Sequence, residues 1–375
     1  MTGTFIITLP AAKRKGKGEK TMHMADALLA PAVAATMYVA SGTAAGISVH
    51  KLKKDENTQK LPTMAVTAAL VFAGQMINYT IPGTGSSGHM CGGMMLSALL
   101  GPQAGFLSMV VILAIQCLFF ADGGLMALGA NCWNMAFYGC FVGYYLIWRP
   151  IVRSNWFGKM EAKAALRMKI IAASVIGCIV TLQLGAFSVV LETSLSGITE
   201  LPFGAFCALM QPIHLAIGLV EGLITSAVLV FVFESRPELL QEVDSEAKGI
   251  SGKRSLKTTV IIIAVVALLV GGALSLFASS NPDGLEWALF GNTDAGYSEN
   301  MALDEEDYGI ESGVANVASS VQEKTAFLPD YAFSNSESAA GTTVSGIVGS
   351  AIVAAVAVGI CALGGFFRKK KQAAK

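Results

Sequence analysis

At 375 residues the chain is long enough for more than one domain, but its composition excludes an ordinary soluble globular protein. Hydrophobic residues make up 53% of the sequence, charged residues make up 14%, and the mean hydropathy is +0.58. The formal net charge is zero, yet basic and acidic residues lie in different segments. Because the apolar residues form blocks of membrane-spanning length, the sequence predicts an all-α polytopic membrane protein.

Residues 1–21 form an N-terminal extension in which a short apolar patch precedes five basic residues. A secretory signal has the reverse order and a longer apolar core, so the extension does not match one. Its basic residues also oppose the membrane orientation that the later loops favour. We expect the working protein to begin at Met22, with a weakly ordered external arm as the alternative.

Nine apolar runs are candidate membrane segments. They comprise residues 27–49, 62–80, 90–100, 102–120, 124–148, 168–191, 203–233, 258–277 and 344–366. The third run has eleven residues, fewer than the roughly 20 that a helix needs to cross a bilayer. We expect it to be a half-helix or a re-entrant segment whose backbone ends are surrounded by protein.

Clusters of Lys and Arg follow the first, fifth, seventh and ninth runs. Cytoplasmic loops carry the excess of these residues, so every odd run is predicted to end in the cytoplasm. The intervening loops 81–88, 121–123 and 192–202 contain no Lys or Arg. This alternation counts the short third run as a crossing, and it predicts that residues 22 and 81–88 are extracytoplasmic.

Between the last two runs, residues 281–343 contain twelve acidic residues and a single base, Lys324. One interpretation is a solvated, partly disordered external loop. The other is an element that attracts cations or docks beside a metal entrance.

Two histidines are predicted on the outer side, His23 directly before the first apolar run and His89 after the glycine-rich residues 83–88. If Met22 is the first residue, its α-amine and the amide and imidazole nitrogens of His23 can chelate one metal ion in fused rings. A nitrogen of His89 would complete a plane of four. Such a plane suits Ni(II) or Cu(II), whereas zinc prefers a tetrahedron and magnesium prefers oxygens, and cobalt is also compatible.

Three further polar residues are candidates for hydrogen bonds that orient the imidazoles, namely Asp26, Asn78 and Ser87. Capping and packing are the alternative roles for these side chains. His214 and Glu221 lie within the seventh run, where ionisable residues are costly. We expect this pair to hold the helix bundle together or to contact a partner.

The stretch from Met22 to Pro31 resembles the mature N-terminus of the CbiM/NikM family, the substrate-capture membrane components of nickel and cobalt energy-coupling-factor transporters. The resemblance extends from residue 22 to about residue 233, and the extension 1–21 departs from it. The matching motifs, in the same order, are residues 72–78, 88–89, 100–102, 120–124, 127–131 and 214–225. By resemblance, the metal ligands belong to Met22, His23 and His89.

A second resemblance concerns Asn281 to Trp287, whose sequence NPDGLEW is similar to the PDGLE domain that takes the place of the CbiN/NikN subunit. The domains expected are therefore a metal-capture core (22–234), a cytoplasmic basic linker (235–257) and a PDGLE/CbiN-like domain (258–375). The core would hold about seven helices. Two further helices would flank the extracytoplasmic loop 281–343.

The chain contains no G-x-x-x-x-G-K-[ST] motif, so it cannot supply a P-loop for ATP hydrolysis. The resemblance implies a non-enzymatic component in the cell membrane, with Ni²⁺ or Co²⁺ as transported substrate and no cofactor. It also implies a transmembrane coupling protein and a cytoplasmic ATPase pair as partners, lipid around the spans and no nucleic acid. The alternatives are a membrane metalloenzyme using the same histidines and an accessory membrane subunit that binds no metal.

Overall fold

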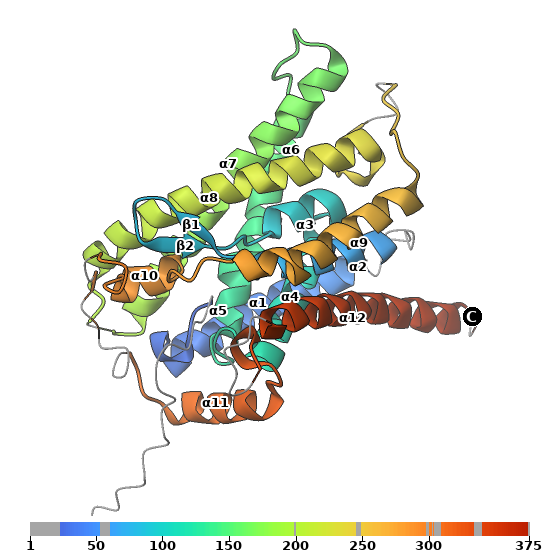
Figure 1. Ribbon diagram of the computed structural model, residues 1–375. Coiled ribbons are helices and arrows are strands. Elements are labelled where there is room, and N and C mark those ends of the chain that lie inside the picture. Colours follow the sequence, from blue (N-terminus) through green and yellow to red (C-terminus); the bar gives the residue numbers. More distant parts are fainter. Residues whose placement is uncertain are drawn as a thin grey trace, which may run out of the picture.

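The computed structural model is a helical bundle (Figure 1). The residues it describes are 23–52, 61–198, 200–244, 249–297, 300–301, 303, 309–333 and 340–373. Its α-helices are α1 (Pro31–Leu52), α2 (Leu61–Gln75), α3 (Gly93–Leu100), α4 (Pro102–Phe120), α5 (Leu128–Asn131), α6 (Arg149–Arg153), α7 (Ala162–Leu195), α8 (Phe203–Ser235), α9 (Leu256–Gly272), α10 (Gly284–Phe290), α11 (Gly313–Thr325) and α12 (Ala340–Ala373).

Four 3-10 helices, one π-helix and one β-hairpin complete the described structure. The 3-10 helices are η1 (Asp26–Leu28), η4 (Pro237–Leu239), η5 (Leu274–Phe277) and η6 (Pro329–Tyr331), and η3 (Cys132–Trp148) is a π-helix. Strands β1 (Tyr79–Ile81) and β2 (Ser86–Gly88) pair antiparallel, with Tyr79 opposite Gly88. The extension 1–21 and Met22 lie outside the described residues.

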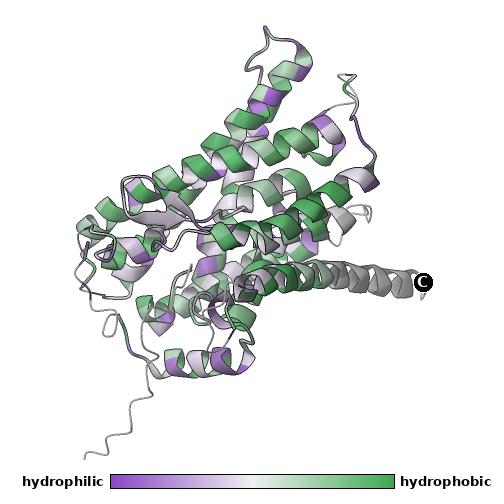
Figure 2. Ribbon diagram, in the orientation of Figure 1, coloured by the Kyte–Doolittle hydropathy of each residue, from purple (hydrophilic) through white to green (hydrophobic). Residues whose placement is uncertain are grey.

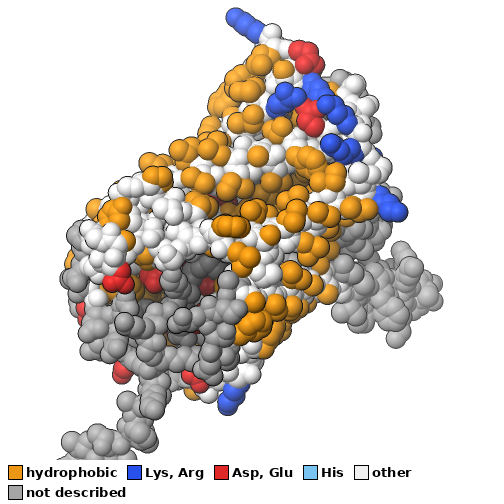
Figure 3. Space-filling model, viewed as in Figure 1, with side chains coloured by type: hydrophobic (Ala, Val, Ile, Leu, Met, Phe, Trp, Pro, Cys, Tyr) orange, Lys and Arg blue, Asp and Glu red, His pale blue; other side chains and the backbone are white. Residues whose placement is uncertain are grey.

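The prediction of an all-α polytopic membrane protein is confirmed. Among the described residues, six helices are long and apolar enough to cross a membrane, and α2 is a shorter apolar helix. Figure 2 shows hydrophobic residues along most of the bundle and a more polar α11. Figure 3 shows a broad apolar surface over the middle of the visible face, as expected for contact with lipid.

The short third element is helix α3, whose eight residues rise roughly 12 Å and are all buried. Glu221 accepts hydrogen bonds from the amides of Cys91 and Gly92 before the helix, both at 2.8 Å. At its other end, Gln241 donates its backbone amide to Ala98 O (2.8 Å) and its side-chain amide to Leu99 O (3.1 Å). Other parts of the protein thus form hydrogen bonds with the backbone at both ends of α3, as the sequence predicts for a half-helix.

The second and fifth predicted runs include residues that are not helical. The second run was expected to reach residue 80, but α2 ends at Gln75 because the chain turns into strand β1. The fifth run was expected from residue 124, but residues 124–127 are a loop and the helix begins at Leu128. From Cys132 onward this helix is π-wound, a rare geometry for which an apolar run gives no signal.

Ion pairs between Glu and Arg or Lys side chains mark one end of the bundle. Glu234 pairs with Arg167 and with Lys163, and Glu242 pairs with Arg149 and Arg153. In Figure 3 most of the visible Lys and Arg side chains gather at the upper right. The hairpin β1–β2 and helix α10 lie at the opposite end, at the left of Figure 1.

Candidate metal centre

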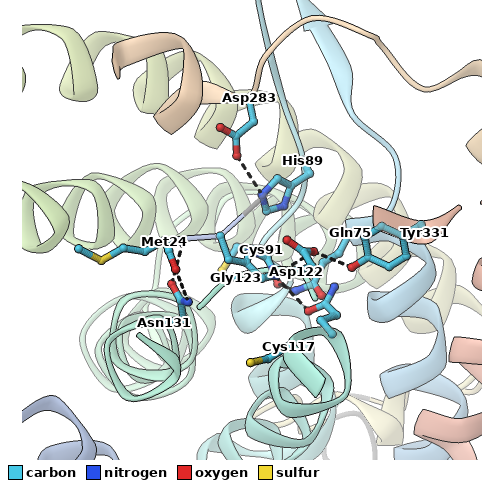
Figure 4. A network of polar contacts seen from close by, with 12 residues as sticks. Met24, Gln75, His89, Cys91, Cys117, Asp122, Gly123, Asn131, Asp283 and Tyr331 are labelled. Carbon is cyan, nitrogen blue, oxygen red and sulfur yellow. Dashed lines mark hydrogen bonds and ion pairs between the residues drawn. The ribbon is translucent and has the colours of Figure 1, made fainter. Parts of the chain in front are cut away.

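The segment that begins at His23 is held by the loop and helix that follow α4. Asn131 bonds both backbone groups of Met24, accepting from its amide at 3.1 Å and donating to its carbonyl at 3.2 Å (Figure 4). The amide of Gly124 donates to the same carbonyl at 3.0 Å. The main chain next to His23 is therefore fixed from two sides.

Gly123 leaves room for His23. Its φ of +78° is in the region that favours glycine, and a Cβ at this position would lie 2.7 Å from the Cβ of His23. The loop thus approaches the histidine more closely than a side chain at residue 123 would allow.

Asp26 anchors the same segment. Its Oδ1 accepts a hydrogen bond from the amide of Ala127 at 2.9 Å, and the side chain is buried. Burial raises the pKa of this carboxyl above its ordinary value, because the charged form loses its hydration. The hydrogen bonds of Asp26 thus hold the loop, and those described do not reach either imidazole.

His23 is 4% exposed, and the two edges of its ring differ in environment. Nε2 lies 3.1 Å from Gln116 Oε1 and 3.7 Å from Asp122 Oδ2. Nδ1 is buried and has no hydrogen-bond partner among the described residues. If Nε2 carries the proton and donates it to Gln116, Nδ1 presents a lone pair to the cavity.

His89 comes to the same place from the hairpin. The ring centroids of His23 and His89 are 5.4 Å apart, at an interplanar angle of 61°. The Nδ1 of His89 lies 3.2 Å from the carbonyl of Met90, to which it donates in one tautomer, and this makes Nε2 the unprotonated nitrogen. The structure thus brings together the two histidines that the sequence analysis selected.

A cavity of about 100 Å³ lies beside the pair, and its lining includes His23, His89, His214, Cys91 and Asp283. A volume of this size holds an ion and a few waters, since one water needs roughly 10–15 Å³ of such space. Within the described residues, no three His, Cys, Asp or Glu side chains are grouped so that they could hold a metal ion by themselves.

Asn78 and Ser87 bond to the chain beyond α9. The carbonyl of Asn78 accepts from the amide of Ser279 at 2.7 Å, and the hydroxyl of Ser87 donates to the carbonyl of Asn281 at 2.8 Å. These two residues therefore fasten the hairpin before His89 to the second domain.

His214 and Glu221 bond to separate partners. The Nδ1 of His214 lies 2.8 Å from the carbonyl of Met210 in its own helix, while Glu221 joins α8 to the start of α3. His214 thus lies on the cavity wall, and Glu221 supports the chain that leaves His89.

Four further polar residues lie around the histidines and are not predicted as site residues from the sequence. They are Gln116, Asp122, Asp283 and Tyr331. Gln116 is a polar residue within an apolar run, which is itself a signal of function, and Asp122 and Asp283 lie inside the motifs quoted above. Tyr331 donates to Asp122 Oδ2 at 2.6 Å (Figure 4), and nothing in its local sequence indicates this contact.

Two buried carboxylates, Asp283 and Asp122, flank the histidines. Asp283 is 5% exposed, and burial raises its pKa to about 7. Asp122 is also buried and receives the hydroxyl of Tyr331, whose pKa burial raises well above the ordinary value, so that this phenol remains a donor.

The fold and the site define a multi-span helical membrane protein with a paired-histidine cavity at one end of its bundle. Residues 23–239 match the family described as the cobalt uptake substrate-specific transmembrane region, CbiM, and residues 257–364 match the PDGLE domain. The chain belongs to the CbiM family, joined here to a PDGLE domain. It is a transport component and not an enzyme.

Two relatives named as fused proteins cover most of this chain, and a third covers 58% of it. A fused nickel transport protein NikMN of Archaeoglobus fulgidus is 34% identical, over 89% of this chain and 96% of its own length. The fused nickel transport protein NikMN of Rhodobacter capsulatus is 30% identical, over 89% and 95%. The cobalt transport protein CbiM of Sorangium cellulosum is 29% identical, over 58% and 94%.

Among solved structures, the chain is similar to the crystal structure of a truncated transition metal transporter. The TM-score is 0.48 at 31% identity, covering 57% of this chain and 99% of that one.

Proposed function

We propose that this chain captures Ni²⁺ or Co²⁺ on the extracytoplasmic side of the cell membrane, as the substrate-binding component of an energy-coupling-factor transporter. A transmembrane coupling protein and a pair of cytoplasmic ATPases would drive the uptake. The names of the relatives support nickel or cobalt as the substrate. The proposed domains are the capture core 22–234, the linker 235–257 and the PDGLE/CbiN-like domain 258–375, with loop 281–343 outside.

One observation carries the proposal, namely the buried, unpartnered Nδ1 of His23 beside the ring of His89. A buried polar atom without a partner costs roughly 1–3 kcal/mol, so it calls for an explanation. A metal ion held by the Met22 amine and the His23 amide would close a six-membered ring through Nδ1 and no such ring through Nε2. The unpartnered atom is thus the one that the proposed chelate requires.

His89 would supply the fourth nitrogen. With its Nδ1 bonded to the Met90 carbonyl, Nε2 is the unprotonated nitrogen that would bind the metal, which is a common arrangement for ligating histidines. Asp122 and Gln116 lie at the opposite edge of His23, where they would fix the orientation of the ring.

The location of the charges supports the proposed side of the site. The paired Arg and Lys residues lie at the end of the bundle away from the hairpin, and such residues favour the cytoplasm. The histidines would then face the outside. Glu221 accepts hydrogen bonds from the amides of Cys91 and Gly92 and so holds the chain that follows His89.

The proposal is tested with His23→Ala and His89→Ala in cells that express the complete transporter, with His50→Ala as the matched control. His50 is an exposed residue in the last turn of α1. Accumulation of ⁶³Ni or ⁵⁷Co should be lost in the first two variants and retained in the third. Normal accumulation in either site variant would refute the proposal, and purified protein that binds no metal would instead indicate an accessory subunit.

The partners are tested separately. The purified complex should contain the coupling protein and both ATPases, and ATP should be required for uptake into proteoliposomes. ATP-independent uptake by this chain alone would refute the assignment to an energy-coupling-factor transporter.

A further inference from the structure

The segment that links α9 to α10 is attached to the hairpin that carries His89. The amide of Ser87 donates to the Pro282 carbonyl at 2.7 Å. The indole of Trp287 donates to the Thr84 carbonyl at 2.9 Å, and the Asn292 amide donates to the Gly85 carbonyl at 2.7 Å. Together with the bonds at Asn78 and Ser87, these contacts fix residues 279–292 of the second domain against the first.

The residues on either side of Asp283, Pro282 and Gly284, hold it against the hairpin and helix α8. Pro282 bonds the hairpin through its carbonyl, and a Cβ at Gly284 would lie 2.8 Å from Ile217 and 3.1 Å from His214, so glycine allows a close approach to α8. The Oδ1 of Asp283 caps α10 by accepting from the amide of Glu286 at 2.8 Å. Its other oxygen is thereby directed toward the cavity.

That second oxygen faces the nitrogen of His89 that the proposed chelate uses. Asp283 Oδ2 lies 3.9 Å from His89 Nε2 (Figure 4). Metal bonds to nitrogen and oxygen are roughly 2 Å long for a divalent ion of this size. A fifth donor at right angles to the four nitrogens would lie roughly 2.8 Å from Nε2, so the carboxylate has to move about 1 Å toward His89 to contact the same ion.

Asp122 occupies a different position. It lies 3.7 Å from Nε2 of His23, the edge of the ring that points away from the chelate. It also accepts the hydroxyl of Tyr331. Of the two carboxylates near the histidines, Asp283 is the one beside a donor nitrogen.

The net charge of the metal chelate favours a carboxylate at the position of Asp283. A divalent ion held by one deprotonated amide and three neutral nitrogens keeps a net charge of +1. An uncompensated charge in a buried cavity is unfavourable, and a single carboxylate would neutralise it.

We propose that Asp283 of the PDGLE domain supplies a fifth, oxygen donor to the captured metal ion and neutralises the chelate. The inference rests on the proposed function. It assigns the second domain a direct part in substrate binding, with a divalent first-row transition-metal ion as the ligand.

The test uses the full chain beginning at Met22, purified in detergent, with Ni²⁺ as the probe. Asp283→Asn removes the charge and retains the cap on Glu286, and Asp283→Ser is a second variant that retains an N-cap. Asp294→Asn is the matched control, because Asp294 is an exposed carboxylate of the same domain. Thermal unfolding establishes that each variant is folded.

We expect both Asp283 variants to bind Ni²⁺ at least tenfold more weakly in isothermal titration calorimetry, while Asp294→Asn binds as the wild type does. The visible d–d absorption of bound Ni²⁺ should also shift in the Asp283 variants. An affinity within twofold of the wild type with an unchanged spectrum would overturn the inference.

Ni K-edge X-ray absorption of the wild type gives a readout that needs no variant. The inference predicts a five-coordinate ion, and a planar, four-coordinate ion would contradict it. Failure of the wild type to bind Ni²⁺ would count against the proposed function itself, so the two failures are distinguishable.

Discussion

His23 and His89 belong to separate segments of the sequence, yet their ring centroids lie 5.4 Å apart and both rings line one cavity. The two histidines reach this place by different means. Asn131 and Gly124 hold the main chain beside His23, whereas Glu221 and the attached second domain hold the chain on either side of His89. The site therefore depends on contacts that join four parts of the chain.

Gly123→Ala should weaken Ni²⁺ binding, because the new methyl group would lie 2.7 Å from the Cβ of His23. Gly197→Ala is the control, since Gly197 has φ +79° and no neighbour within 4 Å of an added Cβ. Both variants bear the strain of a left-handed residue, roughly 1–2 kcal/mol. Equilibrium dialysis should find weaker binding in the first and unchanged binding in the second, and equal affinities would contradict the predicted displacement of His23.

The raised pKa of Asp26 predicts that the stability of the folded protein depends on pH. Its folded-state pKa is raised above 3.8, so its stabilising contribution is complete below pH 3.8 and is lost as the pH rises through the folded pKa. At pH 8 the wild type bears the cost of burying this carboxyl, whereas Asp26→Asn does not and still accepts from Ala127. We expect Asp26→Asn to be at least as stable as the wild type at pH 8.

The control for this prediction is Asp26→Ala, which leaves the Ala127 amide without its acceptor and should be about 1 kcal/mol less stable. Thermal unfolding in detergent at pH 8 and pH 5 measures both effects. The advantage of the Asn variant should shrink at pH 5. Equal destabilisation by Asn and Ala at pH 8 would argue against a raised pKa.

Tyr331→Phe removes the hydroxyl that donates to Asp122, the carboxylate beside His23. Loss of a direct partner of a ligating histidine lowers metal affinity by roughly tenfold or more in other metal sites, and Tyr331, which acts through Asp122, should have a smaller effect. Tyr297→Phe is the matched control, because Tyr297 is 40% exposed in the same domain. We expect weaker Ni²⁺ binding, with a changed pH profile, in Tyr331→Phe alone, and identical behaviour of the two variants would exclude a role through Asp122.

The sequence predicts the helical membrane fold because apolar runs and charged loops are local signals. It also predicts the pair His23 and His89, since both fall on the same predicted side. The hairpin 79–88 and the π-helix are not predicted, because neither leaves a distinct periodicity in an apolar chain. Asn78 and Ser87 were selected for their nearness to His89, and their partners in residues 279–282 became apparent only from the fold.

The proposed metal site depends most on the amine of Met22, which would anchor the ion. Two preparations should be compared by isothermal titration with Ni²⁺, both beginning at Met22, one with a free amine and one with that amine acetylated. Acetylation converts the amine into an amide nitrogen and changes no side chain. We predict tight, stoichiometric binding by the first preparation and a loss of at least a hundredfold in affinity by the second, whereas equal affinities would contradict the account.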